Sequence, residues 1–378
     1  MRLMLLFSFI LVYGCKSEQS ADKNLPTSSD DNSIVHARGF NISELPNGIK
    51  MVHVHSPWPD SDTSFVYALV PKGVDHAEIP GPANAIIPVP VERIILTSTT
   101  HIPALEALGV EDKLVGFPET RYISSEKTRK RIDKGWVAEL GSNELLNTEV
   151  AIELEPELVM GFGIDGQNKA YQTLENTGIP LVYNGDWTEP SPLGKAEWIK
   201  FFGAFFELES KADSIFSAIE TNYSESKRLA QSTPLRPTVI SGALYKDVWY
   251  LPAGESWAAG FIEDANAEYL WKETKGTGSL SLSLETVLDR GAEADFWISP
   301  SQFGSYSDMK KANEHYTRFK PFREKRVHTF ALTKGSTGGL LYYELGPGRP
   351  DIVLCDLIRI FHPELLPDHE PFFFKPLE

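Results

Sequence analysis

The chain is poor in cysteine, with two cysteines in 378 residues. Cys15 lies near the start, whereas Cys355 lies in the apolar, helix-like segment DIVLCDLIRIF, so we expect no disulfide between them and interpret Cys355 as a small core residue. The sequence also contains no cysteine cluster, H-E-x-x-H, G-x-S-x-G or P-loop motif. These absences leave no candidate nucleophile, and we expect no enzyme activity.

Positive charge is also scarce. The chain carries 36 Lys and Arg against 52 Asp and Glu, a formal net charge of -16. Because nucleic-acid binding requires clustered basic residues, this balance argues against a nucleic-acid partner.

No apolar run is long enough to cross a bilayer. The longest, Leu3 to Tyr13, follows Arg2 and is typical of a signal peptide, which we place at residues 1–14. The sequence Val12-Tyr13-Gly14-Cys15 resembles a bacterial lipobox and predicts lipidation of Cys15; the alternative is an ordinary signal peptide followed by an unrelated cysteine. Residues 15–35 are polar and predict a flexible, lipidated tether.

The rest of the chain predicts an α/β protein. Residues 36–90 alternate between apolar and polar residues and predict a small antiparallel β extension at the N-terminus. Residues 91–208 alternate short apolar strands with helices, which indicates an N-terminal lobe with a mainly parallel sheet and ligand sites beyond the strands' carboxyl ends. Residues 209–233 form a long helical pattern without internal Gly or Pro, and residues 234–378 repeat the alternation. We therefore expect two Rossmann-like lobes joined by one long helix, with a cleft between them.

A glycine-rich stretch offers a competing interpretation. Gly161-Phe162-Gly163-Ile164-Asp165-Gly166 follows an apolar strand, and Asp186 lies further along, as in dinucleotide-binding loops. An NAD-dependent oxidoreductase is therefore one alternative function. The simpler interpretation is a turn whose backbone passes close to a ligand or to the facing lobe.

Histidines provide a third alternative, direct capture of a metal ion. The candidate ligands are His53, His55, His76, His101, His362 and His369. Their spacing does not match a known metal-ligand pattern, and histidines in such positions are more often packed or surface residues than metal ligands.

Two helix starts carry matching acids. Glu149 follows Asn147 and Glu285 follows Ser283, each two positions after a helix-capping residue. Simple support of the helix dipole is one explanation. The other is an exposed acid at an equivalent place on each lobe, ready to meet two basic pockets on a symmetric partner.

These segments together resemble one class of proteins. The order of RIILTSTTHIPALEALGVEDKLVG, NTEVAIELEPELVMGFG, ESKADSIFSAIE, SLSLETVLDRGAEADFWISPS and RPDIVLCDLIRIFHPELLPDHE is similar to that of periplasmic substrate-binding proteins of iron-siderophore, haem and cobalamin ABC importers. The resemblance covers about residues 91–370, and the leading segment and the ending resemble a lipoprotein subgroup common in Bacteroidetes.

The resemblance implies a non-enzymatic, monomeric protein, lipid-anchored in the periplasm, with two lobes on a rigid helix. Its partners would be an ABC permease dimer with ATPase subunits, whose arginines pair with Glu149 and Glu285. The chelate is cargo, so no cofactor or directly bound metal is expected. Asn143 and Ser279 replace the cleft tryptophans of the cobalamin-binding relative, so corrinoid specificity does not transfer.

The cleft residues are predicted from physical chemistry instead. Aromatic and polar side chains just past strand ends suit a flat macrocycle or a catecholate. The candidate cleft residues are His101, Phe117, Arg121, Tyr122, Gly163, Trp187, Trp257 and Phe303.

Overall fold

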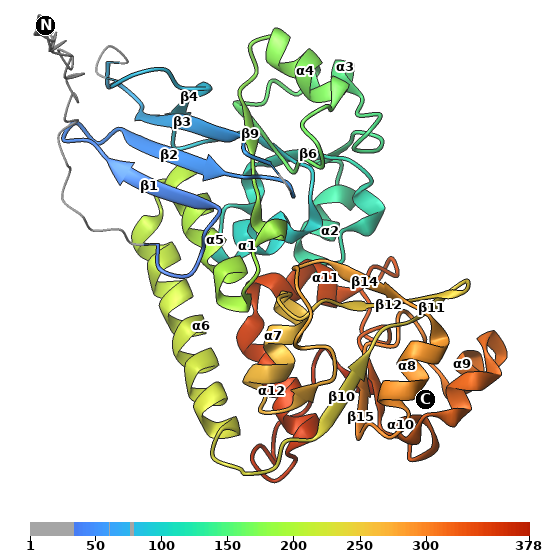
Figure 1. Cartoon of the computed structure of the whole chain (residues 1–378). Helices are drawn as coiled ribbons and strands as arrows, with labels where there is room; N and C mark the ends of the chain where they lie inside the picture. The colour runs from blue at the N-terminus through green and yellow to red at the C-terminus, as the bar shows by residue number, and fades with distance from the viewer. Residues whose placement is uncertain (1–33, 60, 76–78) are drawn as a thin grey trace, which may run out of the picture. The chain divides into compact units, whose positions relative to one another are not determined.

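The computed structural model describes residues 34–59, 61–75 and 79–378 (Figure 1). Cys15, the predicted signal peptide, most of the predicted tether and His76 lie outside the described residues. Within the described ranges, no helix combines the length and the apolar character needed to cross a membrane.

The N-terminal extension is a four-stranded sheet in the order β1-β2-β3-β4. Its strands are β1 (Phe40–Glu44), β2 (Lys50–His55), β3 (Ser64–Pro71) and β4 (Ala85–Val89). The first three pair antiparallel, as expected, but β4 runs parallel to β3. The expectation of a purely antiparallel element was therefore wrong, because β4 begins opposite Tyr67 of β3 and runs in the same direction as that strand.

The extension shares a core with the N-terminal lobe. Val52, Val54 and Tyr67 are fully buried in the same apolar cluster as Ile94 of the lobe's sheet. Alternation along β2 explains this contact, since every second side chain of a strand points to the same face.

The end of the predicted tether is also held in place. Ile34 is buried, and the buried carboxylate of Glu197 accepts hydrogen bonds from the backbone N–H groups of Val35, His36 and Ala37 at 2.6 to 2.9 Å. The nearby Lys200 ammonium lies 3.0 Å from the same carboxylate. Residues 34 and 35 therefore belong to the folded domain rather than to the tether. The polar sequence of this segment gives no sign of this, because the hydrogen-bond acceptor is Glu197, far away in the chain.

The N-terminal lobe is built on a parallel sheet in the order β7-β6-β5-β8-β9. The strands are β5 (Ile94–Leu96), β6 (Leu114–Phe117), β7 (Ala138–Glu139), β8 (Leu158–Gly161) and β9 (Leu181–Tyr183). The helices are α1 (Ile102–Leu108), α2 (Glu126–Asp133), α3 (Thr148–Glu153), α4 (Lys169–Asn176) and α5 (Pro192–Phe205). The strand order reverses at β5, so the loops after β5, β6 and β8 open at the crevice where ligands bind such sheets.

One helix links the two lobes, as predicted. Helix α6 (Glu209–Ala230) spans about 33 Å at 1.5 Å per residue. Its first half buries Phe216 and Ile219 in the core of the N-terminal lobe, and its second half buries Tyr223 and Ala230 in the core of the C-terminal lobe. Because the cores of both lobes pack against the same helix, α6 forms a stiff connection between the lobes (Figure 1).

The C-terminal lobe has a main sheet in the order β13-β10-β15-β16-β17, parallel except for the last strand. Its strands are β10 (Thr238–Ser241), β13 (Glu268–Tyr269), β15 (Phe296–Ile298), β16 (Val327–Thr329) and β17 (Lys375–Pro376). Its helices are α7 (Trp257–Asp264), α8 (Leu284–Gly291), α9 (Tyr306–Ala312), α10 (Lys320–Arg323), α11 (Leu341–Leu345) and α12 (Pro350–Phe361).

A second, antiparallel sheet interrupts the expected alternation. It contains β11 (Ala243–Tyr245), β12 (Val248–Pro252) and β14 (Ser279–Leu282). Lys246, with φ of 56°, helps to form the tight hairpin between β11 and β12, which the turn-poor sequence KD does not signal.

Candidate functional site

A cleft of about 560 Å³ lies between the two lobes. This volume falls within the range of about 300 to 1,000 Å³ that is usual for small-molecule sites. The N-terminal lobe contributes the loops after β5, β6 and β8, and the C-terminal lobe contributes the glycine-rich segment before α11. We call it the interlobe cleft; its principal side chains are Phe117, Arg121, Tyr122, Phe162, Tyr343 and Glu344.

Arg121 and Tyr122 form its exposed polar rim. The Arg121 guanidinium lies 4.8 Å from the centre of the Tyr122 ring and donates to a Glu119 carboxylate oxygen at 2.8 Å. Glu119 adopts a left-handed backbone with φ of 49°, and Glu139 holds it there by accepting from the N–H groups of Glu119 and Thr120. The Arg121 side chain remains 70% exposed, so it can reach an anionic ligand.

A buried carboxylate joins the lobes beside this cleft. Glu344 accepts hydrogen bonds from the N–H groups of Ser124 and Ser125 at 2.6 and 2.9 Å. Burial raises the pKa of Glu344 to about 7, although the two N–H donors favour its charged form. Because the raised pKa means that ionising Glu344 is unfavourable in the folded protein, the cost of burying its charge offsets part of what the two hydrogen bonds contribute above that pH.

Two of the predicted tryptophans line a different hollow. Trp187 and Trp257 lie together with Trp58 around a groove of about 870 Å³. We call it the tryptophan groove; its other walls include Arg38, Gly39, Asp62, Glu189 and Gly278. The structure therefore separates Trp187 and Trp257 from Arg121 and Tyr122, which the sequence placed in one site.

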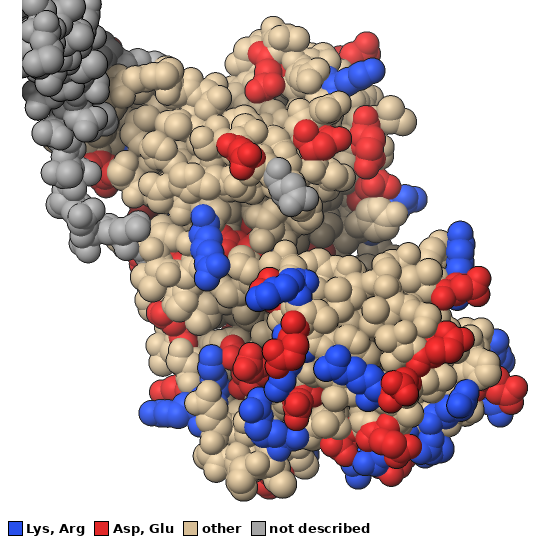
Figure 2. All heavy atoms as spheres, in the orientation of Figure 1, with Lys and Arg blue, Asp and Glu red and all other residues tan. Residues whose placement is uncertain are grey.

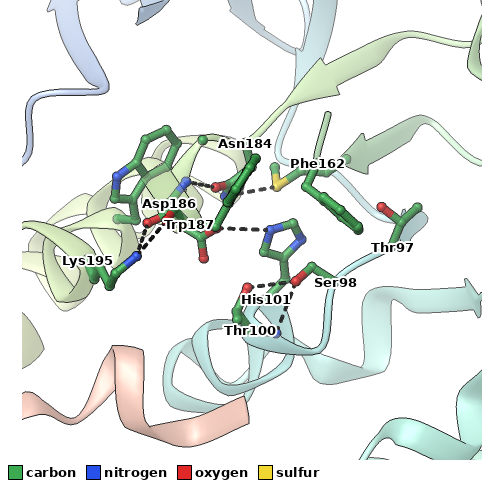
Figure 3. Close-up of polar contacts among 12 residues, drawn as sticks. Thr97, Ser98, Thr100, His101, Phe162, Asn184, Asp186, Trp187 and Lys195 are labelled. Carbon is green, nitrogen blue, oxygen red and sulfur yellow. Dashed lines mark hydrogen bonds and ion pairs between the residues drawn. The ribbon is translucent and has the colours of Figure 1, made fainter. Parts of the chain in front are cut away.

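His101 is buried beside Asp186 rather than in either hollow (Figure 3). Its side chain is fully buried, burial lowers its pKa, and its Nε2 lies 3.9 Å from Oδ1 of Asp186. The Lys195 ammonium donates to the backbone oxygens of Asp186 and Trp187 at 3.0 and 2.9 Å, and burial lowers its pKa. Helix α5 thus fixes the loop that carries Trp187.

The glycine-rich stretch supports an indole ring. A Cβ on Gly163 would lie 2.6 Å from Cε3 of Trp58, and a Cβ on Gly166 would lie 2.8 Å from its Cζ2. At the following helix α4, the backbone N–H groups of Ala170 and Tyr171 already donate to the Asn168 side chain. The glycines at positions 163 and 166 therefore accommodate the Trp58 ring, which a side chain at either position would displace.

Phe303, which was predicted to line the cleft, and the histidines that were considered as metal ligands occupy separate places. The Phe303 ring packs 5.9 Å from Tyr316 at the edge of the C-terminal core. The histidines take local partners: His55 Nε2 lies 2.6 Å from Asn41, His362 Nε2 lies 3.1 Å from the Ala265 oxygen, His369 Nε2 lies 2.7 Å from Asp356, and the His53 ring stacks on His55. Across the described residues, no three His, Cys, Asp or Glu side chains gather to hold a metal ion.

Glu149 and Glu285 are exposed, each near the start of a helix and each on a different lobe (Figure 1). The side chains of Asn147 and Ser283 already accept from the N–H groups of Val150 and Thr286. The pKa of Glu285 is lowered by hydrogen bonds from its own N–H and from Ser283. Both glutamates remain exposed to solvent, and Asn147 and Ser283 supply the side-chain caps of the two helices.

Sequence reasoning missed several residues of the two hollows, namely Trp58, Phe162, Tyr343 and Glu344. Phe162 lies within the glycine-rich stretch, which drew attention to its glycines instead. The run TKGSTGGL before Tyr343 was the available signal, since a glycine-rich loop often marks close approach of backbone to a ligand or another lobe. Gly335 and Gly339 do lie against Ser124 of the facing lobe.

Two α/β lobes on one shared helix, with a cleft at the carboxyl ends of the strands, define a two-lobed solute-binding protein. Residues 94–330 match the model of the periplasmic binding protein family, and the chain belongs to this family. The sequence-based expectation of the family and of its fold is thus confirmed.

Individual relatives agree with this assignment. An uncharacterised lipoprotein of Methanocaldococcus jannaschii is 30% identical over 299 residues, which cover 76% of this chain and 69% of the relative. A possible iron-binding, periplasmic solute-binding protein of Staphylococcus epidermidis has a similar fold with a TM-score of 0.57 at 19% identity, over 72% of this chain and 99% of that chain. A periplasmic haem-binding protein of Roseiflexus gives a TM-score of 0.56 at 19% identity with the same coverage.

Proposed function

We propose that the protein captures a metal chelate in the interlobe cleft and delivers it to an ABC importer. The observation that carries the proposal is the cleft itself, which presents an exposed arginine and aromatic side chains from both lobes. An aromatic wall suits a flat or ring-bearing ligand, and a guanidinium suits carboxylate or catecholate oxygens. The candidates are a corrinoid such as cobalamin, a haem and a ferric siderophore.

The names of similar structures support the same ligand class. They describe a possible iron-binding protein and a haem-binding protein. In this proposal the metal arrives and leaves within its chelate, so the protein has no resident cofactor. The proposal also takes the protein to be a monomer that performs no catalysis.

A titration of the purified protein tests chelate capture. Haem, cobalamin, a ferric catecholate and a ferric hydroxamate are added separately, and the absorption spectrum of each chelate is followed together with equilibrium dialysis. We expect one of these chelates to bind with one molecule per chain. Ferric and zinc ions and NADH serve as comparison ligands. Saturable binding of a bare ion or of NADH, without binding of any chelate, would contradict the proposal.

Delivery requires a docking surface, which we assign to Glu149 and Glu285. Each is exposed on a separate lobe, and neither forms an ion pair among the described residues. Figure 2 shows Lys and Arg interspersed with Asp and Glu over the C-terminal lobe rather than gathered in one patch. Two separate acids match a permease dimer that offers one arginine pocket on each subunit.

We also propose that a lipid on Cys15 anchors the mature protein to a membrane in the periplasm. Ser in place of Cys15 removes the thiol that accepts the lipid, so Cys15→Ser should move the protein from the membrane fraction to the soluble fraction of native cells. Immunoblots of the two fractions measure this, with Cys355→Ser as the matched control that should stay in the membrane. Equal membrane retention of the Cys15→Ser protein would rule out the lipid anchor.

A further inference from the structure

The tryptophan groove is lined by indole rings from three parts of the chain. Trp58 follows β2 of the extension, Trp187 follows β9 and is 39% exposed, and Trp257 begins α7 in the C-terminal lobe. Trp58 is held rigidly, because its ring lies edge-on to Tyr183 with the centroids 5.3 Å apart and rests on Gly163. Rigid indole faces are good contact surfaces for flat rings.

An arginine whose backbone is held in place lies at the same groove. Arg38 is exposed, and its side chain has no ion-pair partner among the described residues. Its backbone is held in place because the N–H groups of Arg38 and Gly39 donate to one Glu189 oxygen at 2.9 and 2.8 Å. A Cβ on Gly39 would lie 2.8 Å from a Trp198 ring carbon, so close packing requires glycine beside Arg38.

An acid completes the polar lining. Asp62 is exposed, lines the groove and likewise has no ion pair in the part of the chain that the structure describes. The groove therefore offers a planar cation that can bind a carboxylate and an anion that can accept a hydrogen bond from a hydroxyl group.

We propose that the tryptophan groove is a binding site for an aromatic ring that carries both a carboxylate and a hydroxyl group. The indoles contact the ring, Arg38 binds the carboxylate, and Asp62 accepts from the hydroxyl group. This site goes beyond the proposed chelate capture, since the groove and the interlobe cleft share no lining residue. The family match begins only at residue 94, so Arg38, Trp58 and Asp62 lie outside it, in the N-terminal extension.

Fluorine NMR of protein labelled with 5-fluorotryptophan tests the site directly. The probe is 2,3-dihydroxybenzoate, and the resonances are assigned by single Trp→Phe substitutions. We expect saturable shifts at Trp58, Trp187 and Trp257. Trp136 is the internal control, because it is 55% exposed, lies near Arg131 and Lys134, and lines neither hollow. Equal shifts at Trp136, or groove resonances that stay unchanged with both the free acid and its ferric complex, would overturn the proposal.

The Arg38→Gln variant tests the carboxylate contact. The substitution keeps the backbone N–H that donates to Glu189. The loss of one charge-assisted contact should weaken the binding of dihydroxybenzoate about tenfold. It should leave the binding of the neutral analogue 2,3-dihydroxybenzamide unchanged. Equal affinity of the variant and the parent for dihydroxybenzoate would remove Arg38 from the site.

A comparison of three probes distinguishes the source of the ring. Free dihydroxybenzoate, its ferric complex and a ferric hydroxamate without aromatic rings are added in turn. Shifts with the free acid indicate a separate aromatic-acid ligand, whereas shifts with the ferric complex alone indicate a substituent of the captured chelate. If neither aromatic probe shifts the resonances, the proposed site is overturned. That result does not bear on chelate capture, which the titration of the purified protein tests separately.

Discussion

Replacing Glu149 and Glu285 together by Gln should abolish stimulation of the importer's ATPase while the fold and the chelate affinity remain unchanged. Both carboxylates face solvent in the free protein, and Asn147 and Ser283 cap the two helices. At a docked permease each acid becomes buried against an arginine, and losing one partner of such a pair costs about 2 to 5 kcal/mol. Stimulation should therefore fall tens-fold or more, measured with the cognate importer in reconstituted membranes.

A matched control is available on the same helices. Glu153 on α3 and Asp289 on α8 are exposed acids, so Glu153→Gln with Asp289→Asn removes the same charge from the same elements. This control should stimulate the ATPase normally. If the Glu149→Gln, Glu285→Gln protein also stimulates normally, helix-dipole support of about 0.3 to 1 kcal/mol is a sufficient explanation of both acids. A compensating Arg→Glu change in the permease should restore part of the coupling.

The second large effect is expected at Arg121. Its guanidinium is exposed in the interlobe cleft and held beside Tyr122. Because a hydrogen bond to a charged group contributes about 1.5 to 3 kcal/mol, Arg121→Gln should weaken an anionic chelate roughly 10- to 150-fold. Equilibrium dialysis of the chelate selected by the titration panel measures the loss.

Arg236→Gln is the control for Arg121, since Arg236 is exposed in the segment after α6 and lines neither hollow. Its affinity should equal that of the parent. The melting temperature of both variants should stay near the parent value, because neither side chain is buried. An Arg121→Gln protein that binds the chelate as tightly as the parent would place the ligand elsewhere.

Periodicity predicted the architecture well. The spacing that buries Phe216, Ile219 and Tyr223 along one helix was visible in the sequence, as were the capping residues Asn147 and Ser283. These features are local, and the residues that create them lie within a few turns of each other.

The site was only partly predictable because its contacts join distant segments. Nothing near Gly163 in the sequence indicates that Trp58 covers it, and nothing near Glu344 indicates that it binds the N–H groups of Ser124 and Ser125. The sequence shows which residues follow strand ends. It does not show which of these residues line the interlobe cleft and which line the tryptophan groove, because that depends on how the two lobes and the extension pack together. Hence Arg121 and Trp187, predicted together, lie in different hollows.

Chelate uptake tests the central claim most directly. Membrane vesicles from native cells that lack this protein are supplied with ATP and with the iron-59 or cobalt-57 form of the chelate that the titration selects. The account predicts that uptake into the vesicles requires added parent protein and is not restored by the Glu149→Gln, Glu285→Gln protein. Uptake at the same rate without the added protein would contradict the account.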